Sequence, residues 1–290
     1  MTIKPIRANF EITNKCNLRC KHCYFFNKLK DNAPLNSNCL SEKEVFNMVK
    51  KLINKGILEL SIGGGEPFCL KNIKKILELS TSKIYTMVTS NGMLLDNKMV
   101  NFLSKLDNFS LQISLDGKKN NHQLIRGISS KQYEMLDKII KKCSQKIDLQ
   151  IGFMLCHINL NDLDFIFQYC FQNSIKRLTI LPYIGYNKKL LLSQKEKRIA
   201  IKKILEYKNK IKVYIRDPRM NNIVNNTKGI CEAGKTTFNI DCTGNVEACP
   251  YFKSRIGHIS NLNIENIPIL FLKKYKIKNR NNCIACNYEN

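Results

Sequence analysis

The chain alternates between short apolar runs and amphipathic helical patterns over its first two-thirds. Six strands that alternate with helices predict a parallel sheet, either a partial barrel or a doubly wound sheet. In both architectures, ligands bind at the carboxyl ends of the strands. The strand-like runs cover residues 8–13, 57–62, 84–89, 109–115, 149–156 and 177–181. The first helical pattern starts at a capping box formed by Ser41 and Glu44. The other helical patterns cover about 71–80, 96–106, 130–144, 161–173 and 193–209.

The pattern changes after about residue 211, where helical periodicity fades and Gly, Asn and Cys become more frequent. A chain of 290 residues has room for one large domain and a small annex. Because so short a segment has little core of its own, metal binding is the expected source of its stability. We therefore expect a first domain over residues 1–210 and a metal-stapled domain over residues 211–290.

Thirteen cysteines are many for a chain of this size. The amino-terminal residues lack the long apolar core of a signal peptide, and no run approaches the roughly 18 apolar residues of a membrane helix. These features predict a cytoplasmic protein without membrane contact. In a reducing compartment, clustered cysteines bind metals more often than they form disulfides.

The formal net charge of +25 comes mainly from lysines spread along the helical patterns. The simplest interpretation of this charge is a solvated lysine-rich surface. The alternative is that the charge binds an acidic partner, either an acidic peptide or a nucleic acid. Arginine is the usual specific reader of bases and phosphates, so its scarcity argues against nucleic acid.

Cys16, Cys20 and Cys23 follow the first predicted strand with the spacing C-x3-C-x2-C. Three thiolates this close together can hold one inorganic centre from a single loop, as in iron–sulfur proteins. Three ligands on a four-iron cluster leave one iron open to a substrate or cofactor. The alternative is a structural zinc site, with His22 as the fourth ligand.

Polar or glycine-rich segments follow the next three strands. They are Gly-Gly-Gly-Glu-Pro at residues 63–67, Thr-Ser-Asn-Gly at 89–92 and Ser-Leu-Asp-Gly at 114–117. Glycines let the backbone approach a ligand closely, although each segment is also compatible with an ordinary turn. Because four successive strands end in such residues, we expect one functional rim at the carboxyl edge of the sheet.

The order of these motifs resembles the radical S-adenosylmethionine (SAM) superfamily over roughly residues 8–182. The resemblance implies a partial (β/α)6 TIM barrel, with a four-iron cluster on Cys16, Cys20 and Cys23 whose open iron chelates SAM. It also implies that Arg126 approaches the SAM carboxylate, although Gln123 stands where that stretch often has Asp. Asp116 is instead expected to hold the end of its strand. The other residues implied to bind the cofactor are Tyr24, Gly64, Gly65, Glu66, Ser90 and Ser114.

The segment after residue 211 resembles the auxiliary-cluster domains called SPASM and twitch. It carries the order C-x12-G-x4-C followed by C-x2-C, with Gly244 as the glycine. The resemblance implies one auxiliary four-iron cluster and a small C-terminal iron–sulfur (twitch-like) domain, and a zinc ribbon is the alternative. The implied ligands are Cys231, Cys249, Cys283 and Cys286.

Six cysteines lie outside both motifs, and three of them, Cys143, Cys156 and Cys170, fit buried core positions. Cys69 and Cys242 are candidate hydrogen-atom donors to a substrate radical, and Cys242 is also a competitor of Cys231 for the cluster. Cys39 has no predicted role. Asp217 is a candidate base or substrate anchor, with a solvated turn as the alternative.

The resemblance implies that SAM is cleaved to a 5′-deoxyadenosyl radical, which abstracts a hydrogen atom from a substrate. The expected substrate is a ribosomally synthesised peptide that undergoes crosslinking, oxidation or epimerisation, and the expected electron donor is a one-electron reductant such as flavodoxin or ferredoxin. The alternatives are a small-molecule radical SAM oxidase that acts on an alcohol, sugar or tetrapyrrole carboxylate, and a non-catalytic iron–sulfur electron-transfer protein.

Overall fold

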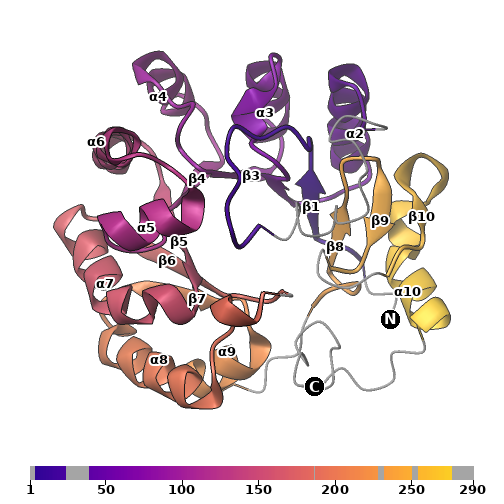
Figure 1. Cartoon of the computed structure of the whole chain (residues 1–290). Helices are drawn as coiled ribbons and strands as arrows, with labels where there is room; N and C mark the ends of the chain where they lie inside the picture. Colours follow the sequence, from indigo (N-terminus) through magenta and orange to yellow (C-terminus); the bar gives the residue numbers. More distant parts are fainter. Residues whose placement is uncertain (1–3, 24–38, 186, 228–231, 250–253, 276–290) are drawn as a thin grey trace.

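The computed structural model describes residues 4–23, 39–185, 187–227, 232–249 and 254–275 (Figure 1). Ten strands of these residues form one sheet in the order β10-β9-β8-β1-β2-β3-β4-β5-β6-β7. From β1 to β7 the strands are parallel and follow the order of the chain. Their bounds are β1 (Arg7–Glu11), β2 (Glu59–Gly63), β3 (Tyr85–Ser90), β4 (Phe109–Ser114), β5 (Leu149–Leu155), β6 (Arg177–Pro182) and β7 (Lys212–Ile215).

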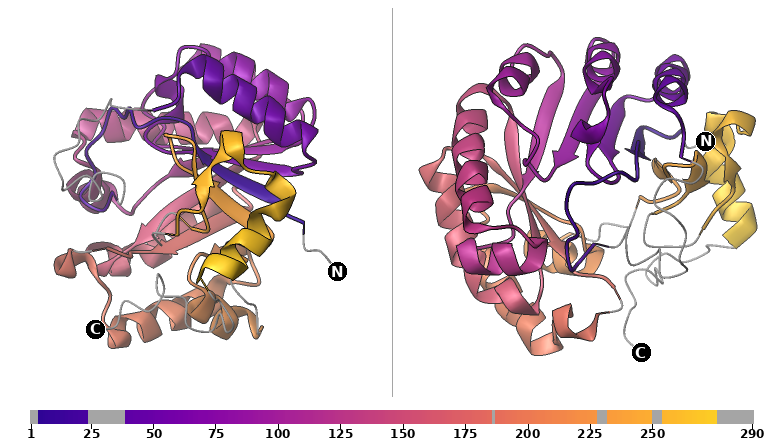
Figure 2. Two further views of the ribbon diagram at one scale, coloured as in Figure 1. Left: turned by 90° about the vertical axis from the view of Figure 1, so that its right-hand side faces the viewer. Right: turned by 45° about the horizontal axis from the view of Figure 1, so that its top comes forward.

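Helices cover the outer face of the curved sheet, which confirms the predicted partial barrel (Figures 1 and 2). The six predicted strands and six predicted helices all occur within a few residues of their expected positions. The helices of the layer are α2 (Glu42–Asn54), α3 (Ile73–Thr81), α4 (Asn97–Leu103), α6 (Ser130–Lys146), α7 (Leu163–Gln172) and α8 (Gln194–Tyr207). Helix α5 (Lys119–Arg126), which was not predicted, lies at the carboxyl edge of the sheet, where the carbonyl of Ile125 accepts from the loop after β1.

The capping box of α2 illustrates how local sequence starts these helices. The backbone N–H of Glu44 donates to the Ser41 side chain, and the Glu44 carboxylate accepts from the Ser41 backbone. These bonds satisfy donors that a helix start leaves unpaired. Apolar residues at helical spacing then place one buried face of α2 against the sheet, including Val45, Val49 and Leu52.

The sheet extends beyond the six predicted strands on both sides. Strand β7 and helix α9 (Pro218–Asn225) follow α8, and β8 (Thr237–Ile240) pairs in parallel with β1. The strands β9 (Asn245–Glu247) and β10 (Gly257–His258) add an antiparallel edge, followed by α10 (Ile267–Tyr275). Strands that precede residue 211 in the sequence and strands that follow it thus belong to one hydrogen-bonded sheet. The division into two domains at this residue stays a prediction.

The pairing of β8 with β1 joins the carboxyl-terminal elements to the barrel core. Phe238 and Ile240 of β8 are fully buried beside Ala8 and Phe10 of β1. On the outer side, the Lys51 ammonium of α2 donates to the carbonyls of Ile259 and Ser260, at 2.7 and 3.0 Å. Figures 1 and 2 both show these yellow elements beside the indigo strand β1.

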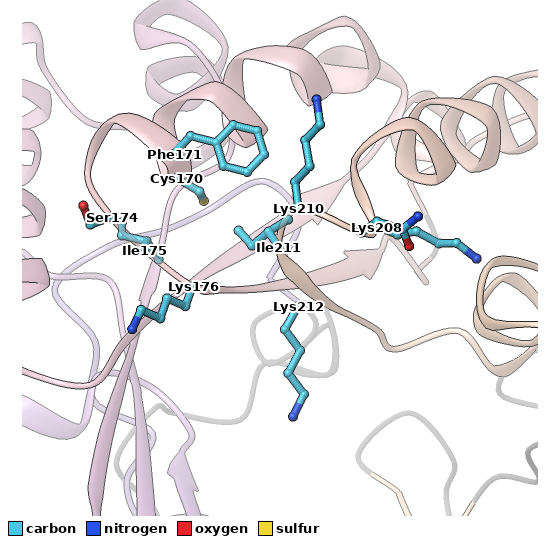
Figure 3. A pocket seen from close by; sticks show the side chains of 10 residues that line it. Cys170, Phe171, Ser174, Ile175, Lys176, Lys208, Lys210, Ile211 and Lys212 are labelled. Carbon is cyan, nitrogen blue, oxygen red and sulfur yellow. The ribbon is translucent and has the colours of Figure 1, made fainter.

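A lysine-rich pocket lies at the amino ends of β6 and β7, opposite the edge where the predicted motifs gather (Figure 3). It is lined by Lys176, Lys208, Lys210 and Lys212 together with Phe171 and Ile175. The Lys208 ammonium already donates to the carbonyl of Val224 at 2.7 Å. Among the described helices, none is long and apolar enough to cross a membrane.

Candidate functional site

The three cysteines of the first motif lie on the loop that follows β1, inside the curve of the sheet (Figure 1). The thiols of Cys16, Cys20 and Cys23 are all partly exposed. The loop is held by the backbone N–H of Lys21, which donates to the carbonyl of Ile125 in α5 at 2.8 Å. Leu18 of the same loop is buried. The loop therefore presents its thiols at the carboxyl edge of the sheet, where a parallel barrel binds ligands.

The glycine segment after β2 packs its backbone directly against this loop. The N–H of Gly65 donates to the carbonyl of Thr13 at 2.7 Å, and the N–H of Glu66 donates to the carbonyl of Lys15 at 2.8 Å. A Cβ on Gly65 would lie 2.1 Å from the Lys15 oxygen, and Gly64 has a φ of +111° that favours glycine. These glycines thus position the cysteine loop, and the two amides are already used within the protein.

Glu66 braces the ends of β2 and β3. Its buried carboxylate accepts hydrogen bonds from the Ser90 hydroxyl at 2.9 Å, the Asn91 N–H at 2.8 Å and the Phe68 N–H at 3.2 Å. Burial raises the pKa of Glu66 to about 6, against the lowering effect of these donors. Ser90 in turn accepts from the N–H of Gly92 at 2.9 Å. Both predicted cofactor residues therefore also have structural roles.

A buried ion pair lies beneath the cysteine loop. The Arg126 Nε donates to the Asp116 carboxylate at 2.6 Å, and the Met154 N–H of β5 donates to the same carboxylate at 2.9 Å. Burial alone would raise the pKa of Asp116, but the Arg126 cation holds it below its ordinary value. Asp116 thus fastens the end of β4 to β5 and fixes Arg126 in place.

Arg126 faces the cysteines, because its positive charge acts on the thiols of both Cys20 and Cys23. Burial nevertheless raises the pKa of Cys20 to about 11. His22, which is half-buried near this cation, has its pKa lowered to about 4, chiefly by desolvation. Its Nδ1 atom has no hydrogen-bond partner among the described residues.

These features fit a cluster better than a single zinc ion. Within the described part of the chain, no three His, Cys, Asp or Glu side chains converge on one metal position. A four-iron cluster instead takes each thiolate on a different iron, so its ligands need not meet at one point. The Arg126 cation complements the negative charge of such thiolates.

The other predicted site residues lie in varied surroundings. Ser114 is buried at the end of β4. Partly exposed Cys69 lies beside the cysteine loop, where its thiol accepts from the N–H of Asn17. Asp217 is not a solvated turn residue: it is buried and caps α9, where its carboxylate accepts from the N–H groups of Arg219 and Met220.

Most of the auxiliary-cluster prediction falls outside the described residues. This applies to Cys231, Cys283 and Cys286, and also to Tyr24 of the first motif. Partly exposed Cys249 follows the β8–β9 hairpin, whose turn contains Gly244 with a φ of +85°. Buried Cys242 lies in the same turn.

Two asparagines near the site were not predicted. The Asn91 amide reaches the cysteine loop, donating to Asn17 Oδ1 at 2.8 Å and lying 3.9 Å from the Cys16 sulfur. Asn159 is fully buried and donates to the carbonyls of Asp116 and Met154. The motif at residues 89–92 contains Asn91 and pointed to the right segment, whereas no local pattern marks Asn159.

Comparison with known proteins identifies the class. The model of the radical SAM superfamily matches residues 10–170, more than half of the chain, and the chain belongs to this superfamily. Membership implies a four-iron cluster and SAM as cofactors.

The sequence identity to individual relatives is below 30% in the two comparisons that follow. The chain is 29% identical over 168 residues to the sporulation killing factor maturation protein SkfB of Bacillus subtilis, which covers 57% of this chain and 40% of SkfB. The chain therefore spans less than half of that relative. It is 24% identical over 302 residues to a cysteine-type anaerobic sulfatase-maturating enzyme of Clostridium perfringens, covering 92% of this chain and 79% of the enzyme.

The fold is similar to that of SuiB from Streptococcus suis, which has been solved alone, with SAM and with its precursor peptide SuiA. The superposition on SuiB alone has a TM-score of 0.76 at 16% identity and covers 98% of this chain and 71% of SuiB. At this identity, the likeness establishes the shared fold.

Replacing Gly65 with Ala should displace the cysteine loop, because the new methyl group overlaps the Lys15 carbonyl. Overpacking of this kind costs about 1–3 kcal/mol. We expect Gly65→Ala to lower both the unfolding temperature and the iron retained after anaerobic reconstitution. Gly63→Ala is the matched control, because a Cβ there has no neighbour within 4 Å. Equal iron content in the two variants would contradict the proposed role of Gly65.

The raised pKa of Glu66 makes stability depend on pH. Between its ordinary value of 4.5 and about 6, the folded state binds more protons than the unfolded state, so the stability contributed by Glu66 is lost as the pH rises. Relative to Glu66→Gln, the wild type should lose about 2 kcal/mol of unfolding free energy between pH 4 and pH 7. Urea denaturation of the metal-free proteins measures this difference. A difference that does not change with pH would show that the pKa is not raised.

Proposed function

We propose that the chain is a radical SAM enzyme that modifies a ribosomally synthesised peptide. The observation that carries the proposal is the loop of three partly exposed thiols at the carboxyl edge of the barrel, backed by the buried Arg126 cation. Similarity to a sulfatase-maturating enzyme over 92% of the chain and to SkfB supports a protein or peptide as the substrate.

In this proposal, Cys16, Cys20 and Cys23 hold the cluster. When bound, the cluster and SAM supply a radical that abstracts a hydrogen atom from the substrate. Gly64 and Gly65 keep the loop at its position, and Arg126 places a fixed positive charge against it. Preorganised charges of this kind need no rearrangement during the reaction.

The remaining predicted cofactor residues line the same edge of the sheet. Ser114 lies at the end of β4, and Glu66 and Ser90 are linked at the ends of β2 and β3. An uncompensated carboxylate in a buried site is costly, and an ammonium group is the ligand that would offset it. We therefore propose that Glu66 faces the amino group of SAM, in addition to its role as a brace.

We further propose that Cys231, Cys249, Cys283 and Cys286 bind one auxiliary four-iron cluster. Support comes from the spacing of these cysteines and from the hairpin that places Gly244 and Cys249 on the strand pair next to β1. Electrons would arrive from a flavodoxin or ferredoxin, and an auxiliary cluster would provide an acceptor for the electron that a substrate radical loses as it is oxidised.

Replacing Cys16, Cys20 and Cys23 together with Ala should abolish formation of 5′-deoxyadenosine. It should also remove about half of roughly eight irons per chain, because each cluster holds four. Anaerobic iron analysis and chromatography of the products measure both effects. Cys143→Ala, in the buried face of α6, is the control that should keep its iron. Continued formation of 5′-deoxyadenosine by the triple variant would overturn the site.

Replacing Cys283 and Cys286 with Ala should remove only the auxiliary cluster. SAM cleavage should persist, because the first cluster performs it, whereas turnover of a precursor peptide should fall at least tenfold. Circular dichroism distinguishes lost electron transfer from an unfolded segment, since metal-dependent regions unfold without their metal. Full iron content in this variant would refute the proposed ligand set, and turnover of a small molecule in place of any peptide would favour the small-molecule alternative.

A further inference from the structure

Two cysteines outside both cluster motifs meet in the folded chain. The sulfur atoms of Cys39 and Cys242 lie 2.7 Å apart, although 203 positions separate these residues in the sequence. The backbones also touch, because the N–H of Leu40 donates to the carbonyl of Cys242 at 2.8 Å. Cys39 lies two residues before Ser41, the N-cap of α2, and Cys242 lies in the turn that follows β8.

The separation of the two sulfurs argues against a metal ion between them. Two thiolates on one tetrahedral zinc ion, each about 2.3 Å from the metal, lie roughly 3.8 Å apart. Ligands on different irons of a cluster need not approach each other at all. A disulfide bond is about 2.05 Å long. The observed separation is therefore closer to a covalent bond than to a shared metal ion.

The two thiols also differ in accessibility and acidity. Cys39 is partly exposed, and hydrogen bonds from Cys242 and from the Asn14 N–H lower its pKa against the opposing effect of burial. Cys242 is only 7% exposed, and its hydrogen bond to Cys39 and its burial both raise its pKa. An accessible thiol of lowered pKa beside a protected partner is the arrangement of an attacking and a resolving cysteine.

We propose that Cys39 and Cys242 form a reversible disulfide by exchange with an external disulfide. The Cys39 thiolate attacks one sulfur of that disulfide and releases the first thiol. The Cys242 thiolate then attacks the Cys39 sulfur of the mixed disulfide and releases the second thiol. The protein loses two electrons and two protons, and the external disulfide gains them as two thiols.

The bond would fasten the start of α2 to the β8–β9 turn. The turn follows β8, which pairs with β1, and Cys39 accepts from the N–H of Asn14 just after β1, the strand that leads into the cysteine loop. A hydrogen bond between the two segments runs from the Leu40 N–H to the Cys242 carbonyl. Oxidation would replace a separable contact with a covalent one at the side of the cluster site, whatever reaction the enzyme performs.

The test is carried out on the reconstituted protein in anaerobic glutathione buffers of stepped redox potential. Free thiols are blocked with a maleimide, and the digest is analysed by mass spectrometry. We expect a peptide pair linked through Cys39 and Cys242 that appears at oxidising potentials with a single midpoint and disappears when dithiothreitol is added. Absence of this pair at every potential would overturn the proposal.

Variants separate a disulfide from a metal site. Cys39→Ser should abolish the linked pair and leave the iron content unchanged, and Cys170→Ser, in the buried face of α7, should retain the pair. The oxidised wild type should unfold at a higher temperature than the reduced form, and Cys39→Ser should lose that difference. Loss of iron from Cys39→Ser would identify Cys39 as a cluster ligand and overturn the disulfide.

Discussion

The candidate site depends on the close approach of two backbone segments. The loop after β2 can hydrogen-bond to Thr13 and Lys15 only because Gly64 and Gly65 place no side chain between the two segments. That contact fixes the start of the cysteine loop against the rigid edge of the sheet. Three flexible thiols on an unsupported loop would have to be ordered when a cluster binds, and this ordering costs conformational entropy. Here the entropy is lost when the barrel folds.

Buried charge is the second constraint on the same region. Asp116 and Arg126 compensate each other, and Asp116 also accepts from the backbone of β5. Because the Asp116 carboxylate lies 2.6 Å from the Arg126 Nε, it offsets part of the cost of keeping this cation charged beneath the cysteines. Glu66 accepts from three neutral donors, and among the described residues no ion pair is formed by it, so its carboxylate is less compensated than that of Asp116. The site thus contains the Asp116 carboxylate, which Arg126 neutralises, and the Glu66 carboxylate, which is open to a cationic ligand.

Sequence patterns predicted the strands that carry the site because those strands are long and apolar. They missed β7, whose four residues alternate exposed Lys212 and Tyr214 with less exposed neighbours and so lack a strong apolar run. They also missed α5, since the polar stretch at residues 119–123 has no visible helical periodicity. The motifs located Arg126 and Glu66, but their partners depend on how α5 and the loops fold. The contact of Cys39 with Cys242 leaves no trace in the sequence, because nothing local relates two positions so far apart.

The parallel pairing of β8 with β1 also has a consequence for biosynthesis. Strand β1 is translated well before β8, so one of its edges stays unpaired until residues 237–240 have been made. Contacts between such distant segments form late and slow the folding of a domain. During that interval the nascent barrel exposes an open strand edge, a feature prone to misassembly. The sheet edge beside the cysteine loop is therefore complete only after translation has passed the residues of β8.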